Sequence, residues 1–189
     1  MLSFNQKIWY LITQTIYALT FGKIGKRCLV YKPLQLDGRK AIYLEDDVYI
    51  AQGAWLKAKG KEKTLWIERG STIGHFSHII AWKSVTIGSN VLIADKVFIS
   101  DCSHRYEDID IPIKKQGIKI LSPVSIGEDS WIGENVCVCG ASIGKHCIIG
   151  ANSVVLSDIP DYCVAAGAPA KVVKRFDTEK NEWEKVINE

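Results

Sequence analysis

The sequence predicts an all-β fold, a parallel β-helix, because aliphatic residues recur every six positions and glycines directly follow many of them. An α-helix repeats near every 3.6 residues and a flat strand near every 2, so neither element alone explains this period. Three such repeats would make one triangular coil, and successive coils would stack about 4.8 Å apart. The aliphatic positions, called the ladder below, are Ile67, Ile73, Ile79 and Val85 in a first run, Ile87, Ile93 and Ile99 in a second run two residues out of phase, and Ile126, Ile132, Val138, Ile143, Ile149 and Val155 in a third.

Residues 1–25 are expected to form a helical segment outside the coil, since Ile8, Leu11 and Leu19 follow helical spacing. One interpretation is a cap that covers the open strand edges at the end of a solenoid. The other is an amphipathic segment that lies on a membrane surface. The two are compatible. Residues 1–40 carry seven basic residues and one acidic residue, which favours peripheral membrane association through this segment.

Residues 26–170 form the expected β-helix domain, which has one interruption. Ile99 and Ile126 stand 27 positions apart, and this leaves a projecting loop at about residues 100–121. Long loops on a compact solenoid are usually functional, so the interruption is the first place to look for chemistry. Residues 171–189 are interpreted as a tail that ends in a short C-terminal helix.

Composition and charge argue against several classes of protein. The chain has 189 residues and a net charge of +3, too weak by itself to indicate nucleic-acid binding. Its longest uncharged stretch has 15 residues, short of the roughly 20 that cross a bilayer. The six cysteines show neither CxxC pairs nor zinc-ligand spacing, so no metal is expected. They are typical of small apolar residues in a reducing compartment, which predicts a cytoplasmic protein.

The second half of the chain carries a dense series of motifs. They are Trp131-Ile132-Gly133, Ile149-Gly150-Ala151, Asp158-Ile159-Pro160 and Gly167-Ala168-Pro169-Ala170-Lys171. In this order they resemble the hexapeptide-repeat acetyltransferases, above all the branch with galactoside, maltose and polysaccharide O-acetyltransferases. The resemblance covers roughly residues 30–175. It implies a left-handed coil, a homotrimer, and an active site between subunits with acetyl-CoA lying along the coil.

His104 and Asp101, both in the interruption, are the candidate catalytic residues. A sugar hydroxyl is a poor nucleophile at neutral pH, so its attack on a thioester needs a proton acceptor, and imidazole has an ordinary pKa near 6.5. The resemblance implies that the histidine before the projecting loop is this general base. Asp101 is expected to orient the imidazole or bind the acceptor, and its alternative is a solvated turn residue.

The resemblance also implies the residues that contact the cofactor. Trp131 would line the cofactor groove, unless it is a core or interface aromatic. Three residues would pass close to the pantetheine arm, mainly through their backbone, and two lysines would meet the phosphates unless they form a solvated tail. These residues are Ala151, Leu156 and Ser157, and Lys171 and Lys174.

The predicted function is that of an acetyl-CoA-dependent O-acetyltransferase acting on a sugar or glycan precursor. The alternatives are N-acetylation of an amino sugar, acetylation of a xenobiotic, and a non-catalytic trimeric scaffold. His75 and His78 raise a γ-class carbonic anhydrase as a further alternative, but the two late histidines of that family, five residues apart, are absent.

The chain departs from the family pattern at one corner. Relatives commonly have Pro-Gly and one more residue between the positions of Val138 and Ile143, whereas this chain has Cys139-Gly140 and is one residue short. We therefore expect a tighter turn there and a reshaped groove.

Overall fold

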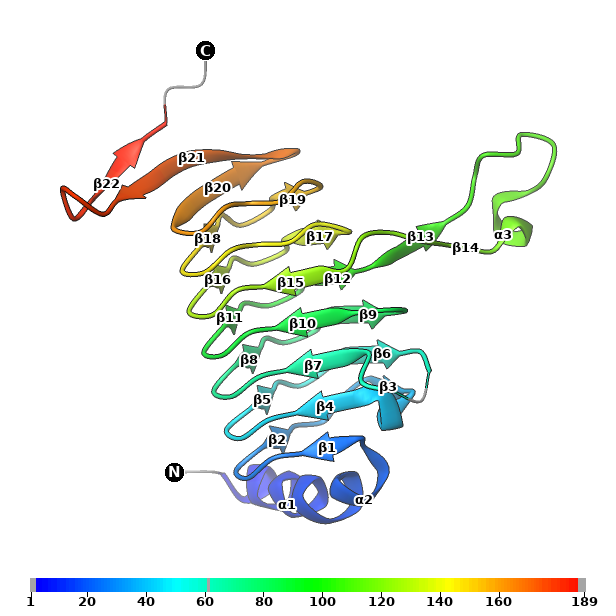
Figure 1. The fold of residues 1–189 in the computed structure, drawn as a ribbon. Coiled ribbons are helices and arrows are strands. Elements are labelled where there is room, and N and C mark those ends of the chain that lie inside the picture. Colours follow the sequence, from blue (N-terminus) through cyan, green and yellow to red (C-terminus); the bar gives the residue numbers. More distant parts are fainter. Residues whose placement is uncertain (1–2, 61, 187–189) are drawn as a thin grey trace.

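The computed structural model describes residues 3–60 and 62–186 and is a left-handed parallel β-helix of about seven coils (Figure 1). Three parallel sheets form the sides of the coil. The first contains β1 (Lys23–Ile24), β4 (Ile42–Leu44), β7 (Leu65–Ile67), β10 (Val85–Ile87) and β15 (Val124–Ile126). The second contains β2 (Leu29–Val30), β5 (Tyr49–Ile50), β8 (Thr72–Ile73), β11 (Leu92–Ile93), β16 (Trp131–Ile132), β18 (Ile148–Ile149) and β20 (Cys163–Gly167). The third contains β3 (Gln35–Asp37), β6 (Trp55–Ala58), β9 (His78–Ala81), β12 (Phe98–Ser100), β17 (Cys137–Cys139) and β19 (Val154–Val155).

The ladder forms the core, as the six-residue period predicts. Its members are buried, and most of them pair in register with a ladder residue of a neighbouring coil, as Ile79 does with Ile99. The two-residue change of phase is explained by the register. Val85 pairs with Leu65 and Ile87 pairs with Ile67, so Val85 begins a new side and does not continue the run that ends at Ile79. The extra residues lie in the corner between the third and first sheets.

The N-terminal segment is helical and caps the coil. It runs through α1 (Phe4–Ile12), a π-helical turn η1 (Thr13–Tyr17) and α2 (Ala18–Thr20), together called the cap helix below. The fully buried Thr13 hydroxyl accepts a hydrogen bond of 3.0 Å from the backbone N–H of Val30, so the helix occupies the open edge of the first coil. In the part of the chain that the structure describes, no helix is long and apolar enough to cross a membrane.

The interruption projects from the coil as an arm of residues 102–120 (Figure 1). The antiparallel strands β13 (Cys102–His104) and β14 (Ile118–Ile120) form its base, and α3 (Ile113–Gln116) lies near its end. A second short helix, the 3-10 turn η2 (Arg39–Ala41), lies between β3 and β4.

The predicted C-terminal helix is wrong. Described residues of the tail form a β-hairpin instead, in which β21 (Ala170–Asp177) pairs antiparallel with β20 and with β22 (Glu182–Lys185). Phe176 and Trp183 face each other across the hairpin with ring centroids 5.3 Å apart. This cross-strand aromatic contact favours strands over a helix. Residues 1–2 and 187–189 of the predicted end segments lie outside the described residues.

Candidate active site

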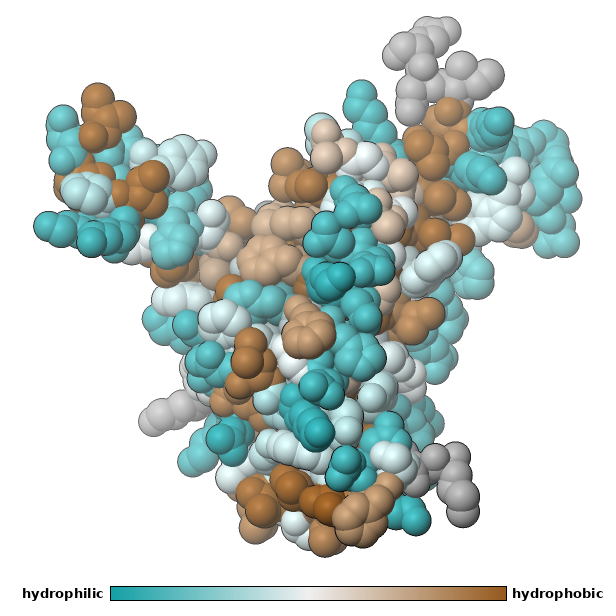
Figure 2. Space-filling view, turned by 180° about the vertical axis from the view of Figure 1, so that it is seen from behind, coloured by the Kyte–Doolittle hydropathy of each residue, from teal (hydrophilic) through white to brown (hydrophobic). Residues whose placement is uncertain are grey.

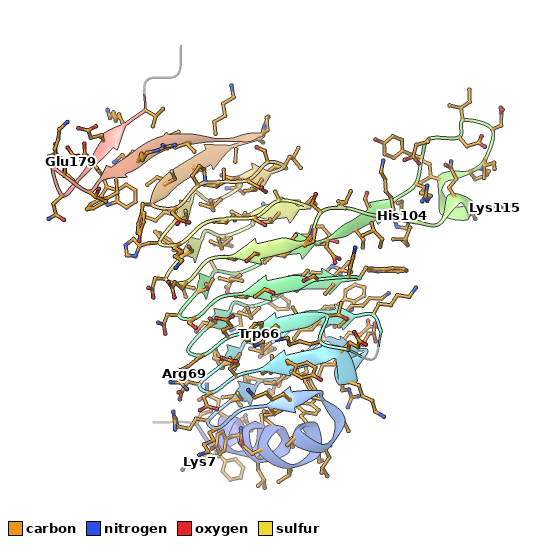
Figure 3. All side chains as sticks on the ribbon, viewed as in Figure 1. Lys7, Trp66, Arg69, His104, Lys115 and Glu179 are labelled. Carbon is orange, nitrogen blue, oxygen red and sulfur yellow. The ribbon has the colours of Figure 1, made fainter. Side chains whose placement is uncertain are left out.

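His104 ends β13 at the base of the arm, where the chain leaves the coil (Figure 3). Its backbone is held by the pairing of β13 with β14, opposite Ile118, while the side chain is exposed. It borders a surface pocket of about 320 Å³. The arrangement presents an imidazole from a hydrogen-bonded strand to an open pocket, as a general base requires. The other residues that line the pocket are Lys57, Ile80, Trp82, Phe98, Ser100, Cys102, Ser103, Ile118 and Cys139.

Asp101 is a structural residue of the corner and not a solvated one. Its side chain is fully buried, and its carboxylate accepts hydrogen bonds from the backbone N–H groups of Trp82 (2.7 Å), Lys83 (2.6 Å) and Ser84 (2.7 Å). No hydrogen bond joins Asp101 to His104 among the described residues. The carboxylate therefore fixes the corner of the coil below and, with it, Trp82 in the wall of the pocket.

The corner between the third and first sheets brings together one part of the predicted cofactor site. Strands β12, β17 and β19 are consecutive in the third sheet, so their carboxyl ends meet along one edge. His104 follows β12, Cys139 ends β17, and the exposed Leu156 and Ser157 follow β19. These residues make a continuous edge that rises from the pocket toward the C-terminal end of the coil.

A second part of the predicted cofactor site lies at the next corner. Ala151 follows β18, and Lys171 pairs with Ala166 on β20, the strand beside β18. Gly150 lies against Ala166, so Ala151 and Lys171 lie at the same corner of the coil with β20 between them. Lys174 lies further along β21, opposite Val164, and both lysines are exposed.

Trp131 lies apart from His104 within one chain. It is on β16 of the second sheet, 49% exposed, whereas His104 follows the third sheet. Its exposed indole is therefore not a core residue. One chain alone does not place Trp131 beside the imidazole of His104.

The other histidines have local contacts that account for them. His75 Nδ1 lies 3.1 Å from Asp95 at an exposed corner. The ring of His78 stacks on Trp55 at 4.0 Å, and burial lowers the pKa of its imidazole. Among the described residues, no group of three or more His, Cys, Asp or Glu side chains is arranged to hold a metal ion.

Sequence reasoning missed the residues of the pocket that come from lower coils. Lys57 and Ile80 occupy successive levels of the third sheet in register with Ser100, and Lys59 covers the ring of Trp82 with its ammonium 3.7 Å from the ring centroid. The six-residue spacing alone does not place Ile80 beside Ser100, because the corner between β9 and β10 contains extra residues and its length is not fixed by the repeat.

A pair of thiols lies on β17, and one of them, Cys139, lines the pocket. Cys137 and Cys139 lie on one face of β17 with their Sγ atoms 3.5 Å apart. The hydrogen bond from Cys139 lowers the pKa of Cys137 to about 7, while the same contact and burial raise the pKa of Cys139. The contact therefore favours the thiolate on Cys137 over that on Cys139.

The coil, the arm and the exposed histidine at its base define a hexapeptide-repeat protein, and comparison with known proteins agrees. Residues 123–157 match a family described as the hexapeptide repeat of succinyl-transferase. The chain is 30% identical over 188 residues to the galactoside O-acetyltransferase of Escherichia coli, covering 92% of this chain and 88% of that protein. The chain belongs to the hexapeptide-repeat acetyltransferase family.

One further relative and one solved structure are also similar to this chain. A protein of Mycobacterium tuberculosis named as a probable acetyltransferase is 38% identical over 177 residues, which are 88% of this chain; the chain spans 57% of that relative's length. The crystal structure of AntD, an N-acyltransferase from Bacillus cereus in complex with dTDP and 3-hydroxybutyryl-CoA, superposes with a TM-score of 0.75 at 17% identity. It covers 89% of this chain and 90% of that one, and at this identity it supports the fold alone.

Proposed function

We propose that this chain transfers an acetyl group from acetyl-CoA to a hydroxyl group of a sugar or glycan precursor, with His104 as the general base. The observation that carries the proposal is the exposed imidazole at the mouth of the pocket, on a strand anchored to the coil. The similarity to a galactoside O-acetyltransferase supports a hydroxyl acceptor.

The proposed reaction is direct transfer without an acyl-enzyme. The neutral imidazole takes the proton of the acceptor hydroxyl as the oxygen attacks the thioester carbonyl carbon. A carbon–oxygen bond forms, the carbon–sulfur bond breaks, and the departing CoA thiolate takes the proton from the imidazolium. A positioned base of this kind contributes about 10²–10⁴ to the rate. Asp101 contributes by position, because it holds the corner that carries Trp82.

The proposed cofactor path follows the edges described above. Leu156 and Ser157 are exposed on the same edge as His104, two strands of the third sheet further toward the C-terminal end, and the thin pantetheine arm would run along this edge. Lys171 and Lys174 supply two exposed ammonium groups for phosphate, which a lysine binds as a mobile point charge.

We further propose a homotrimer whose active sites lie between subunits. The exposed apolar side chains of the arm, Ile109 and Ile113, and the separation of Trp131 from His104 both support a neighbour that completes the site. A cytoplasmic location is proposed as well, since acetyl-CoA is supplied there.

The test is release of the CoA thiol from acetyl-CoA with panels of sugars, amino sugars and antibiotics, which separate the acceptor classes. His104→Asn should lower kcat/KM by about 10²–10⁴ with the preferred acceptor. The matched control is His146→Asn, since His146 is also exposed but lies at another corner of the coil. Its activity should stay within about twofold of the wild type.

Equal turnover by the wild type and His104→Asn would refute the general base. Absence of turnover with every acceptor, together with absence of acetyl-CoA binding in calorimetry, would favour a non-catalytic scaffold. Turnover with amino sugars alone would replace O-transfer by N-transfer.

A further inference from the structure

The cap helix has two faces, and only one of them is used by the fold. Thr13, Trp9 and Gln14 face the first coil, where Trp9 packs edge-on against Tyr31 and Gln14 donates hydrogen bonds to backbone carbonyls. The opposite face is exposed and apolar. Its side chains are Phe4 (77% exposed), Ile8 (44%), Leu11 (63%), Ile16 (55%) and Leu19 (87%).

These side chains gather at one end of the molecule. Figure 2 shows hydrophobic residues clustered at the N-terminal end of the coil, where the cap helix lies across the base of the stack in Figure 1. The exposed face runs along about 25 Å of helix, given 1.5 Å per residue over residues 4–20. A continuous apolar surface of this kind on a soluble domain marks an interaction site.

Unpaired positive charge lies on and near the cap helix. Among the described residues, Lys23 and Arg27 pair with Glu45 and Asp47, whereas Lys7, Lys26 and Lys40 are exposed and form no ion pair. Residues 3–36 contain no acidic side chain at all. Excess positive charge beside an apolar face complements a negatively charged surface.

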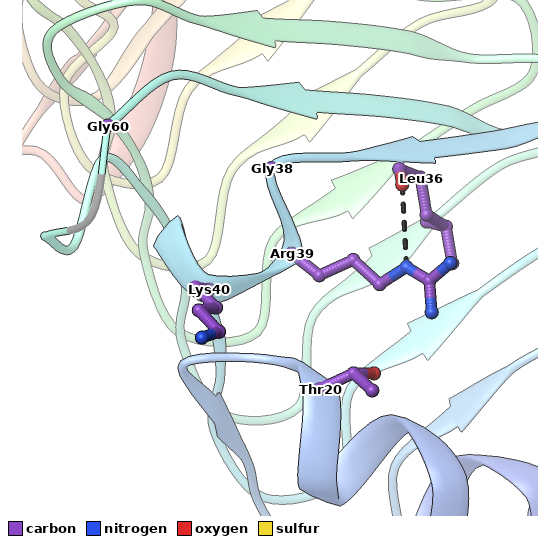
Figure 4. A pocket seen from close by; sticks show the side chains of 6 residues that line it. All are labelled: Thr20, Leu36, Gly38, Arg39, Lys40 and Gly60. Carbon is purple, nitrogen blue, oxygen red and sulfur yellow. Dashed lines mark hydrogen bonds between the residues drawn. The ribbon is translucent and has the colours of Figure 1, made fainter.

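A basic pocket lies where the cap helix ends. It has a volume of about 400 Å³ and is lined by Thr20, Leu36, Gly38, Arg39, Lys40 and Gly60 (Figure 4). Arg39 Nε donates to the carbonyl of Leu36 at 3.5 Å, and its guanidinium lies 5.7 Å from the centroid of the Tyr17 ring. Two cations in a recess beside Thr20, the last residue of the cap helix, suit a phosphate group.

We propose that the cap helix docks this protein on an anionic phospholipid bilayer, with its exposed apolar face in the interfacial region and the basic pocket on a lipid phosphate. A helix of this length with an apolar face and basic flanks lies in the membrane surface and does not cross it. The coil axis would then stand away from the bilayer, with His104 four coils above the lipid. An acceptor carried on a lipid would approach the site from the side of the cap helix, so membrane docking would bring a lipid-linked acceptor to the proposed active site.

The test is flotation of the purified full chain with vesicles of phosphatidylcholine alone and of phosphatidylcholine with about 30% phosphatidylglycerol, a content chosen for an anionic surface. The wild type should float with the anionic vesicles and be released by salt. The double variant Leu11→Ser with Leu19→Ser should lose at least about tenfold in partition coefficient, since both side chains leave water on docking. Lys26→Glu with Lys40→Glu should lose at least about tenfold on anionic vesicles and little on neutral ones.

The matched control is Leu92→Ser, which removes a leucine with 50% exposure from the side of the coil and should float like the wild type. Failure of the wild type to float with anionic vesicles would overturn the proposal, as would equal flotation of Leu11→Ser with Leu19→Ser. A smaller assembly size for that double variant in solution, with unchanged flotation, would assign the face to a second copy of the chain. Flotation needs no turnover, so its failure and failure of the acetyltransferase assay are separate results.

Discussion

Replacing Asp101 should lower the free energy of unfolding, which replacing a residue that acts only in catalysis would leave unchanged. Its carboxylate accepts three backbone hydrogen bonds of 2.6–2.7 Å in a fully buried position. Leaving a buried donor without a partner costs about 1–3 kcal/mol. Asp101→Ala leaves three backbone N–H donors without an acceptor. We therefore expect the free energy of unfolding to fall by about 3–6 kcal/mol, allowing for partial relaxation. Because a domain has only about 5–15 kcal/mol of stability, this variant will approach the limit of folding.

Asp101→Asn is the more informative variant. Its amide oxygen can keep two of the hydrogen bonds, while its NH₂ group faces the third donor, so we expect a loss of about 1–3 kcal/mol. Urea unfolding followed by tryptophan fluorescence at fixed protein concentration measures the free energy of unfolding, and thiol release measures kcat/KM. Glu182→Ala, an exposed carboxylate on β22, is the control and should change stability by less than about 0.5 kcal/mol.

The two roles of Asp101 are separable by this pair of measurements. A positioning role predicts that Asp101→Asn loses stability and only part of its activity, because the shifted corner displaces Trp82. Unchanged stability together with a loss of kcat/KM as large as that of His104→Asn would refute the reasoning and make Asp101 a catalytic residue.

Three further predictions concern other parts of the chain. Thr13→Val leaves a buried backbone N–H of the first coil without an acceptor and should cost about 1–3 kcal/mol in urea unfolding. Lys119 lowers the pKa of Glu107 to about 2. At pH values above the ordinary carboxyl pKa of about 4.3, the ionised pair should therefore stabilise the arm, and this stabilisation should be lost as the pH falls toward 2. NMR titration of Glu107 measures this. Cys139→Ala should raise the pKa of Cys137 and slow its alkylation by iodoacetamide near neutral pH.

Each of these has a distinct contradicting result. A Thr13→Val protein as stable as the wild type would mean that the cap helix does not seal the first coil. If the pKa of Glu107 is unshifted in the wild type, or does not rise in Lys119→Gln, the proposed stabilisation of the arm by the Glu107–Lys119 ion pair is wrong. Equal alkylation of Cys137 with and without its neighbour would show that the thiol pair does not set its reactivity.

The coil was predictable because its pattern is local. Each inward position is occupied by an aliphatic side chain, so the six-residue spacing directly reports which residues face the core. The phase change at Val85 was visible but not interpretable, since corners of different length separate the sheets and only the strand pairing fixes which residue begins a side. The tail was mispredicted because the Phe176–Trp183 contact is made between two strands. A contact of this kind produces no hydrophobic periodicity along the sequence.

The candidate site was predictable only in part. His104 stands out because it follows the last regular ladder position before the interruption. The role of Asp101 was not visible, because its three partners are backbone N–H groups in the previous coil and carry no side-chain signature. The pocket was equally hidden, since Lys57 and Trp82 reach it from different coils.

The short corner after Val138 is matched to the arm beside it. Gly140 adopts a positive φ of 58° and donates its backbone N–H to the carbonyl of Ser100 at 2.9 Å. A Cβ atom at Gly140 would stand 2.7 Å from Cβ of Leu121, where the arm rejoins the coil, so this corner has no room for a side chain. Cys139, the neighbour of Gly140, lines the pocket of His104. The tight corner and the arm therefore shape the pocket together, because lengthening the corner would push against the returning chain and move Cys139 in the pocket wall.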